Sequence, residues 1–267
     1  MRNPLIAIGI LVSGYLLVSL LKADVDKRLV KQDILNTIQT DNQLNTADRI
    51  ADTSRLFLGV DYQANTLTSI NAEKETLVKN LNHVDNLTLL DYVISLAFSD
   101  SFAQFEHNLS RVRYLHGHID YITRRHFFSD WLNDNTFNLI DMTAKLSTRT
   151  VTTLKHINQK TPQGQRWIPS VPITDRHINF IPRQFIDENL MAQLKNGDLI
   201  GIYSHKLGLD VSHTGILINK ERKVYLRHAS LKNDKVVDTP LMQYLKNKPG
   251  ILIYRFNNPT LAYTPIQ

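Results

Sequence analysis

The apolar residues of this chain recur at helical spacing in its first half and at strand spacing near its end, and this order limits the possible folds. Helical spacing predicts two helices between residues 26 and 58, broken near residues 40–42, and further helices over 87–98 and 102–114. Asp85 is well placed as the N-cap of the 87–98 helix. Strand patterns cover residues 199–203, 214–219, 223–229 and 251–256. Helices followed by strands predict an α+β fold.

A proline-rich segment separates the two halves. Its prolines, which predict a long irregular connection, are Pro162, Pro169, Pro172 and Pro182. Beyond it, the turn signal Asn196-Gly197-Asp198 introduces the first strand.

The N-terminus carries an uncharged, mostly apolar run from Pro4 to Leu21. As a helix, these 18 residues are about 27 Å long, which is close to the ~30 Å hydrocarbon core of a bilayer. Signal-peptide cleavage before Asp24 is disfavoured, because Leu21 stands where a small residue is needed. We therefore expect a signal anchor over 1–22, a helical linker over 23–50 and one main domain over 51–267. A buried core helix is the alternative for the apolar run.

The chain has no cysteine, which excludes disulfides, thiolate metal ligands and a cysteine nucleophile. The net charge of +6 is spread along the sequence without a dense basic block, so no nucleic-acid partner is expected. A mild positive charge suits an anionic membrane or cell-wall surface.

Two histidines lie on neighbouring predicted strands. The strands 214–219 and 223–229 flank a tight polar turn at Lys220-Glu221, and a symmetric hairpin about this turn places His213 opposite His228. Directly opposed residues have Cβ atoms roughly 4.5–5.5 Å apart. The hairpin therefore predicts a histidine pair, although two separate strand-end histidines with satisfied hydrogen bonds remain the alternative.

Six short motifs lie in a fixed order between residues 50 and 256. They are Gly59-x-x-Tyr62, Arg113-Tyr114…Gly117, Arg125-His126-Phe127…Asp130-Trp131, Asn196-Gly197-Asp198-Leu199, Asp210-Val211-Ser212-His213-Thr214-Gly215-Ile216 and Arg227-His228-Ala229-Ser230. In this order they resemble the motifs of the NlpC-type papain-like cell-wall hydrolases, and most closely their N-acetylmuramoyl-L-alanine amidase-like branch. The resemblance implies a papain-like fold, with helices packed on an antiparallel, barrel-like sheet.

The same resemblance assigns the candidate catalytic positions. Such hydrolases use the cysteine of an Asp-Cys-x-Thr motif at a helix N-terminus, where the helix dipole lowers the thiol pKa. Here the motif is Asp85-Asn86-Leu87-Thr88, so Asn86 occupies the nucleophile position. His213 then matches the general base and His228 its orienting partner. A carboxamide neither ionises near neutral pH nor attacks a carbonyl, and Thr88 lies about 200° further around the helix.

The remaining motif residues are expected to bind substrate, by holding a carboxylate or a sugar face. They are Tyr62, Arg113, Arg125, His126, Trp131 and Asp210. A structural scaffold of helix-end charges around a buried tryptophan, with Asp210 capping a turn, is the alternative.

These observations favour an exported cell-envelope protein, anchored in the inner membrane by residues 4–21, that recognises peptidoglycan peptides without cleaving them. A first alternative is an active amidase or endopeptidase with a non-cysteine mechanism, such as a zinc enzyme using His116, His118 and His126. No acidic ligand pattern completes that set, so we expect no metal and no cofactor. A second alternative is a purely structural envelope protein.

Overall fold

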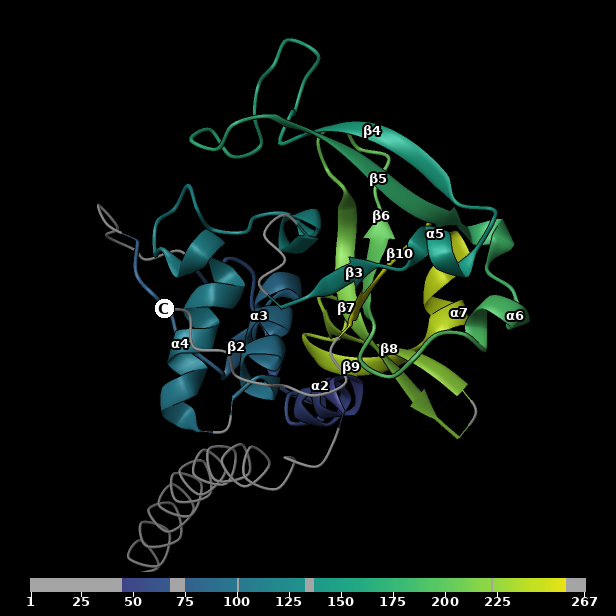
Figure 1. Ribbon diagram of the computed structural model, residues 1–267, viewed down its shortest axis with the longest axis horizontal. Helices are drawn as coiled ribbons and strands as arrows, with labels where there is room; N and C mark the ends of the chain where they lie inside the picture. The colour runs from purple at the N-terminus through teal and green to yellow at the C-terminus, as the bar shows by residue number, and fades with distance from the viewer. Residues whose placement is uncertain (1–44, 68–74, 100, 133–136, 222, 258–267) are drawn as a thin grey trace, which may run out of the picture.

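The computed structural model describes residues 45–67, 75–99, 101–132, 137–221 and 223–257 (Figure 1). The expected membrane helix over 1–22 and most of the linker lie outside these residues. Within the described ranges, no helix combines the length and the hydropathy needed to cross a bilayer.

Three helices form one layer of the molecule: α2 (Thr46–Arg55), α3 (Asn86–Ala97) and α4 (Phe102–Arg113). The predictions for α3 and α4 are confirmed to within a residue. Asp85 caps α3 as expected, accepting hydrogen bonds from the backbone N–H groups of Leu87 and Thr88. Helix α3 is buried from Thr88 to Ala97, because α2, α4 and the sheet pack around it. Residues 50 and 51, the expected linker–domain boundary, both lie inside α2 and pack into the core.

A single sheet in the order β2-β1-β9-β8-β7-β6-β10-β5-β4 forms the other layer, with β3 paired to β10. All its strand pairs are antiparallel except β1–β2. The strands are β1 (Asp61–Tyr62), β2 (His83–Val84), β3 (Leu139–Asp141), β4 (Val151–Ile157), β5 (Thr174–Pro182), β6 (Leu199–Tyr203), β7 (Val211–Lys220), β8 (Lys223–Ser230), β9 (Lys235–Pro240) and β10 (Gly250–Phe256).

The sheet curls into a half-barrel, with α2, α3 and α4 on one face and three short helices near the other (Figure 1). The short helices are α5 (Thr143–Leu146), α6 (Glu188–Met191) and α7 (Leu241–Tyr244). Alternating residues of β7 divide between the two faces: Ile216 packs in the cluster beneath the helices, and Leu217 in the cluster enclosed by the curl. The expected α+β class and antiparallel sheet are confirmed.

The prediction of a long irregular connection over residues 162–182 was wrong in part. Strand β5 occupies its C-terminal portion and pairs along its whole length with β4, and neither strand was predicted. Four of the seven residues of β4 are exposed and they do not alternate regularly, so the strand lacks the apolar pattern that signals a half-buried strand. Strand β9, also not predicted, has a charged residue at two of its six positions and ends in a proline.

Candidate active site

The two predicted histidines meet, although not in the predicted register. In the β7–β8 hairpin Leu217 pairs with Leu226, whereas the symmetric prediction paired Leu217 with Val224. The turn lies one residue further along, where Glu221 has a positive φ of 49°. A displacement of two residues keeps every side chain on its own face. His213 and His228 therefore still share a face, and His213 Nε2 lies 2.9 Å from His228 Nδ1.

The histidine pair lies on the sheet face enclosed by the curl. His213 pairs with Ile202 of β6, whose side chain belongs to that cluster. The Tyr244 ring of α7 packs against both imidazoles, with centroid distances of 5.8 Å to His213 and 4.8 Å to His228. His228 Nε2 lies 3.1 Å from Thr239 Oγ1 of β9. Thr239 and Tyr244 thus complete a cluster that the sequence did not predict, because they come from separate elements without a local motif.

Both imidazoles are held neutral. Burial, followed by repulsion from His228 and Lys248, lowers the pKa of His213 to about 3. Burial also lowers the pKa of His228 to about 4, with Asp238 opposing the shift and Lys248 adding to it. Hydrogen bonds link His213 through its Nε2 to His228, and His228 to Thr239. The Nδ1 atom of His213 makes no hydrogen bond to any described residue. A neutral His213 with its proton on Nε2 therefore has a lone pair on Nδ1.

We expect the ring resonances of His213 and His228 to stay constant between pH 8 and about 5 in an NMR titration of the folded protein. Their folded pKa values lie below the ordinary value of 6.5, so the unfolded chain takes up these protons first. The associated stability is complete above pH 6.5 and is lost as the pH falls towards 4. His213→Gln and His228→Gln variants assign the resonances. Titration of either ring near pH 6.5 would contradict the buried, neutral pair.

Asn86 opens α3, directly after the Asp85 cap. Its backbone oxygen accepts a 2.7 Å hydrogen bond from Thr214 Oγ1, which fixes the helix N-terminus against the strand of His213. The Asn86 side chain is half-buried and makes no hydrogen bond to any described residue, including the two histidines. Thr214 points to the helix face of β7 and His213 to the opposite face. The Asn86 backbone therefore contacts Thr214, the residue that follows His213, but the Asn86 and His213 side chains make no hydrogen bond to each other.

One further predicted residue, Tyr62, lies near the Asp85 cap that precedes Asn86. Tyr62 on β1 pairs in register with Val84, two residues before Asn86. Burial and the nearby Asp85 carboxylate raise the pKa of the Tyr62 hydroxyl, so it stays protonated. Thr88 does not offer a free hydroxyl, because its Oγ1 is bonded to the backbone and carboxylate of Asp85.

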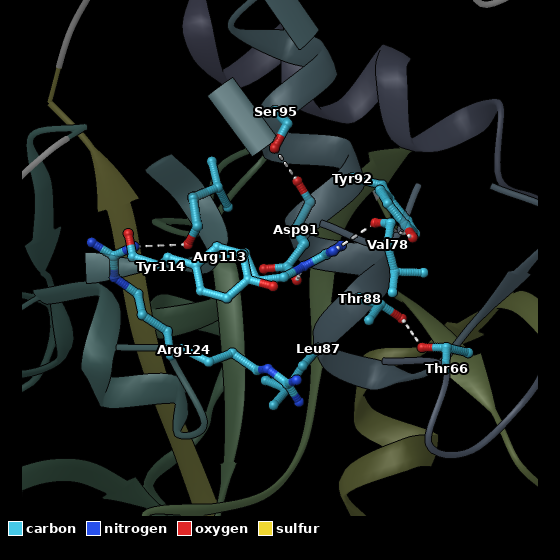
Figure 2. Close-up of polar contacts among 12 residues, drawn as sticks. Thr66, Val78, Leu87, Thr88, Asp91, Tyr92, Ser95, Arg113, Tyr114 and Arg124 are labelled. Atoms are coloured by element: carbon cyan, nitrogen blue, oxygen red, sulfur yellow. Dashed lines mark hydrogen bonds and ion pairs between the residues drawn. The ribbon is translucent and has the colours of Figure 1, made fainter. Parts of the chain in front are cut away.

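Arg113 lies within the helical layer (Figure 2). Its Nε donates to Asp91 Oδ2 at 2.7 Å, and its Nη1 donates to the Val78 carbonyl at 2.6 Å. The side chain is 1% exposed and lies over the Tyr92 ring. These contacts fit the structural alternative for Arg113.

The other predicted binding residues also have partners within the protein. Arg125 Nη1 donates to three backbone carbonyls, and Trp131 Nε1 donates to the Val112 carbonyl. A ring nitrogen of His126 bonds the Tyr121 carbonyl, and burial lowers the pKa of that imidazole. The buried Asp210 accepts from the backbone N–H groups of Ser129 and Val211. The structure does not bring these four residues into contact with the histidine pair.

The described residues contain no group of three or more histidine, cysteine or carboxylate side chains that could hold a metal ion. The zinc set considered as an alternative therefore does not assemble there: His126 Nε2 is bonded to the Tyr121 carbonyl.

Comparison with known proteins agrees with this architecture. The family model of AmiA-like, N-acetylmuramoyl-L-alanine amidase-like proteins matches residues 52–251. An N-acetylmuramoyl-L-alanine amidase from Bacteroides uniformis is similar in structure, with 29% identity, a TM-score of 0.67 and coverage of 80% of this chain and 99% of that one. A Legionella pneumophila protein of family DUF1460 shares the fold at 24% identity and a TM-score of 0.73, over 90% and 99% of the two chains. No curated protein sequence matches. The chain belongs to the AmiA-like, N-acetylmuramoyl-L-alanine amidase-like family.

Proposed function

We propose that this protein binds peptidoglycan peptides at the N-terminus of α3 and does not hydrolyse them by a thiol mechanism. The observation that carries the proposal is the Asn86 side chain, which has no hydrogen-bond partner among the described residues and stands where the amidases it resembles carry their nucleophile. A carboxamide offers two N–H donors and one acceptor oxygen, which suit a peptide bond. The family and the amidase neighbours support peptidoglycan as the ligand class.

The papain-like assignment belongs to the same proposal. A papain-like site packs a helix N-terminus against a strand that carries a histidine, and the Thr214–Asn86 hydrogen bond supports that packing here, with His213 on the opposite face of the strand. The resemblance assigns His213 and His228 to the base and its orienting partner, and Tyr62 to the substrate side of α3. Arg125 and Trp131 are assigned a scaffold role, because they bond backbone carbonyls at the end of α4.

The proposal also concerns location. Peptidoglycan lies outside the cytoplasmic membrane, so we expect the main domain there, with residues 4–21 as the membrane anchor. A C-terminal reporter that is active only in the cytoplasm would contradict this location.

We expect the purified protein to bind soluble peptidoglycan fragments and to release no product from them. Binding is measured by calorimetry and hydrolysis by mass spectrometry, each with and without a chelator. Asn86→Ala removes the carboxamide while leaving the Asp85 cap in place, and it should weaken binding by about tenfold, or roughly 1.4 kcal/mol.

The outcomes separate the alternatives. Chelator-sensitive cleavage would replace the proposal with a metal-dependent hydrolase, and chelator-resistant cleavage would require a different nucleophile. Absence of both binding and cleavage would favour a purely structural envelope protein.

A further inference from the structure

A cavity of about 300 Å³ lies between the 115–130 segment and the start of β5, and its lining includes neither Asn86 nor the histidine pair. Its apolar wall includes Leu115, Ile122, Phe127, Val171 and Pro172. Ile122 is 58% exposed at this wall. The volume is at the lower end of the range for small-molecule sites, so the cavity suits a ligand of about the size of a dipeptide.

Arg176 of β5 gives the cavity wall a specific polar feature. Its Nη1 lies 2.5 Å from Asp130 Oδ1 and 2.8 Å from Ser129 Oγ, which uses both hydrogens of that nitrogen. The Nε and Nη2 atoms have no hydrogen-bond partner among the described residues, and the side chain keeps 16% of its surface exposed. The guanidinium is thus fixed on one side and open along its Nε–Nη2 edge. Such an edge matches a carboxylate with two parallel hydrogen bonds.

The charge of the wall favours the same ligand. The residues that line the cavity include three arginines, at positions 124, 125 and 176, and one carboxylate, Asp130. Arg124 is held by Glu75 through its Nε and Nη2 atoms. Fixed cations beside an apolar surface favour a ligand that carries both an anionic group and an aliphatic part.

We propose that this cavity binds a short peptide with a free carboxylate, the carboxylate on Arg176 and an aliphatic side chain against Ile122 and Phe127. The inference rests on the proposed function, for which it supplies a second subsite. Ser129 connects the two places: its hydroxyl accepts from Arg176, and its backbone N–H donates to Asp210, the residue before β7. Strand β7, which begins one residue after Asp210, carries His213, so hydrogen bonds link the cavity wall to the start of that strand.

The test uses N-acetyl-alanyl-glutamate, which has two free carboxylates, as the probe. Its uncharged diamide is the comparison ligand. The full chain should bind the dicarboxylate at least about tenfold more tightly than the diamide in calorimetry, with binding weakened by added salt. Thr174→Glu places a carboxylate at an exposed position of the cavity wall and should weaken binding of the dicarboxylate by about tenfold or more. Arg176→Lys, which keeps the charge and loses the planar edge, should weaken it as well.

His177→Glu is the matched control, because it makes the same charge change on the same strand, at an exposed residue whose side chain points to the other face. It should bind the dipeptide like the native protein. Equal affinity for the dicarboxylate and the diamide, or native affinity in Thr174→Glu, would overturn the cavity assignment. If Thr174→Glu binds wall fragments normally and Asn86→Ala does not, the cavity assignment fails and the proposed function stands. Failure of the native protein to bind wall fragments would instead overturn the proposed function.

Discussion

Asn86→Cys is expected to turn this protein into a thiol hydrolase of peptidoglycan fragments, with a rate about 10²-fold or more above that of the native protein. The substitution places a thiol at the first position of α3, where the helix dipole favours the thiolate. Mass spectrometry of soluble wall fragments measures the released products. The native protein, without a nucleophile at this position, sets the baseline.

The base needed for that reaction is already neutral. The pKa of His213 is lowered to about 3, so the imidazole is unprotonated across the neutral range, and its Nδ1 makes no hydrogen bond to any described residue. His228 Nδ1 bonds the other ring nitrogen of His213, and Thr239 Oγ1 in turn bonds His228 Nε2. Transfer of the thiol proton to Nδ1 produces the thiolate and an imidazolium, a step that requires the new thiolate to raise the pKa of His213 from its native value of about 3. Attack on the amide carbonyl, with return of that proton to the departing amine, then gives an acyl-enzyme.

Two measurements make the outcome decisive. The alkylation rate of the introduced thiol against pH should report a pKa below the ordinary value of about 8.5, and His213→Ala in the Asn86→Cys background should abolish hydrolysis. Because His213 points to the face of β7 opposite Thr214 and makes no hydrogen bond to Asn86, the reaction also requires the imidazole and the new side chain to turn towards each other, and a small misplacement costs about 10²-fold. A thiol with an ordinary pKa and no hydrolysis would contradict the assignment of Asn86. Native hydrolysis that persists in Asn86→Ala and is lost in His213→Ala would point to a different nucleophile.

The sequence predicted the elements whose signals are local. Helix α3 has an aspartate cap and a dense apolar stripe, and β6 has a turn signal followed by five buried residues, so both were predicted to within a residue. The histidine pair was predicted despite the wrong register, because face depends only on parity along the strand and the error was an even number of residues.

What the sequence could not supply depends on contacts between distant segments. Thr239 and Tyr244 reach the histidines only because β9 and α7 pack beside β8, and neither residue carries a motif. Strand β4 is mostly exposed and is held to β5 by a ladder of seven pairs, so apolar periodicity missed it. Arg113 and Trp131 were recognised as motif residues, but a motif does not distinguish a ligand contact from a buried partner such as Asp91 or the Val112 carbonyl.

Arg113→Met is expected to destabilise the protein by about 3–5 kcal/mol, a large part of the ~5–15 kcal/mol that holds a typical domain. The Arg113–Asp91 pair is almost completely buried, with side-chain exposures of 1% and 5%. Removal of the arginine leaves the carboxylate without its charge partner, and the Val78 carbonyl loses its donor. Urea unfolding followed by circular dichroism measures the loss as a lower midpoint at an unchanged slope.

The double variant Arg113→Met/Asp91→Leu distinguishes an unpaired charge from lost packing. It removes both charges at once, together with the Arg113 Nη2 group, which is buried without a hydrogen-bond partner in the described structure. Because the desolvation cost of a buried pair can exceed its Coulomb gain, the double variant should be clearly more stable than Arg113→Met. Glu106→Gln is the exposed control: its pair with Lys79 has exposures of 46% and 42%, so the change should cost no more than about 1 kcal/mol. A double variant as unstable as the single one would show that the Arg113 side chain stabilises the helical layer through its packing, and not by neutralising Asp91.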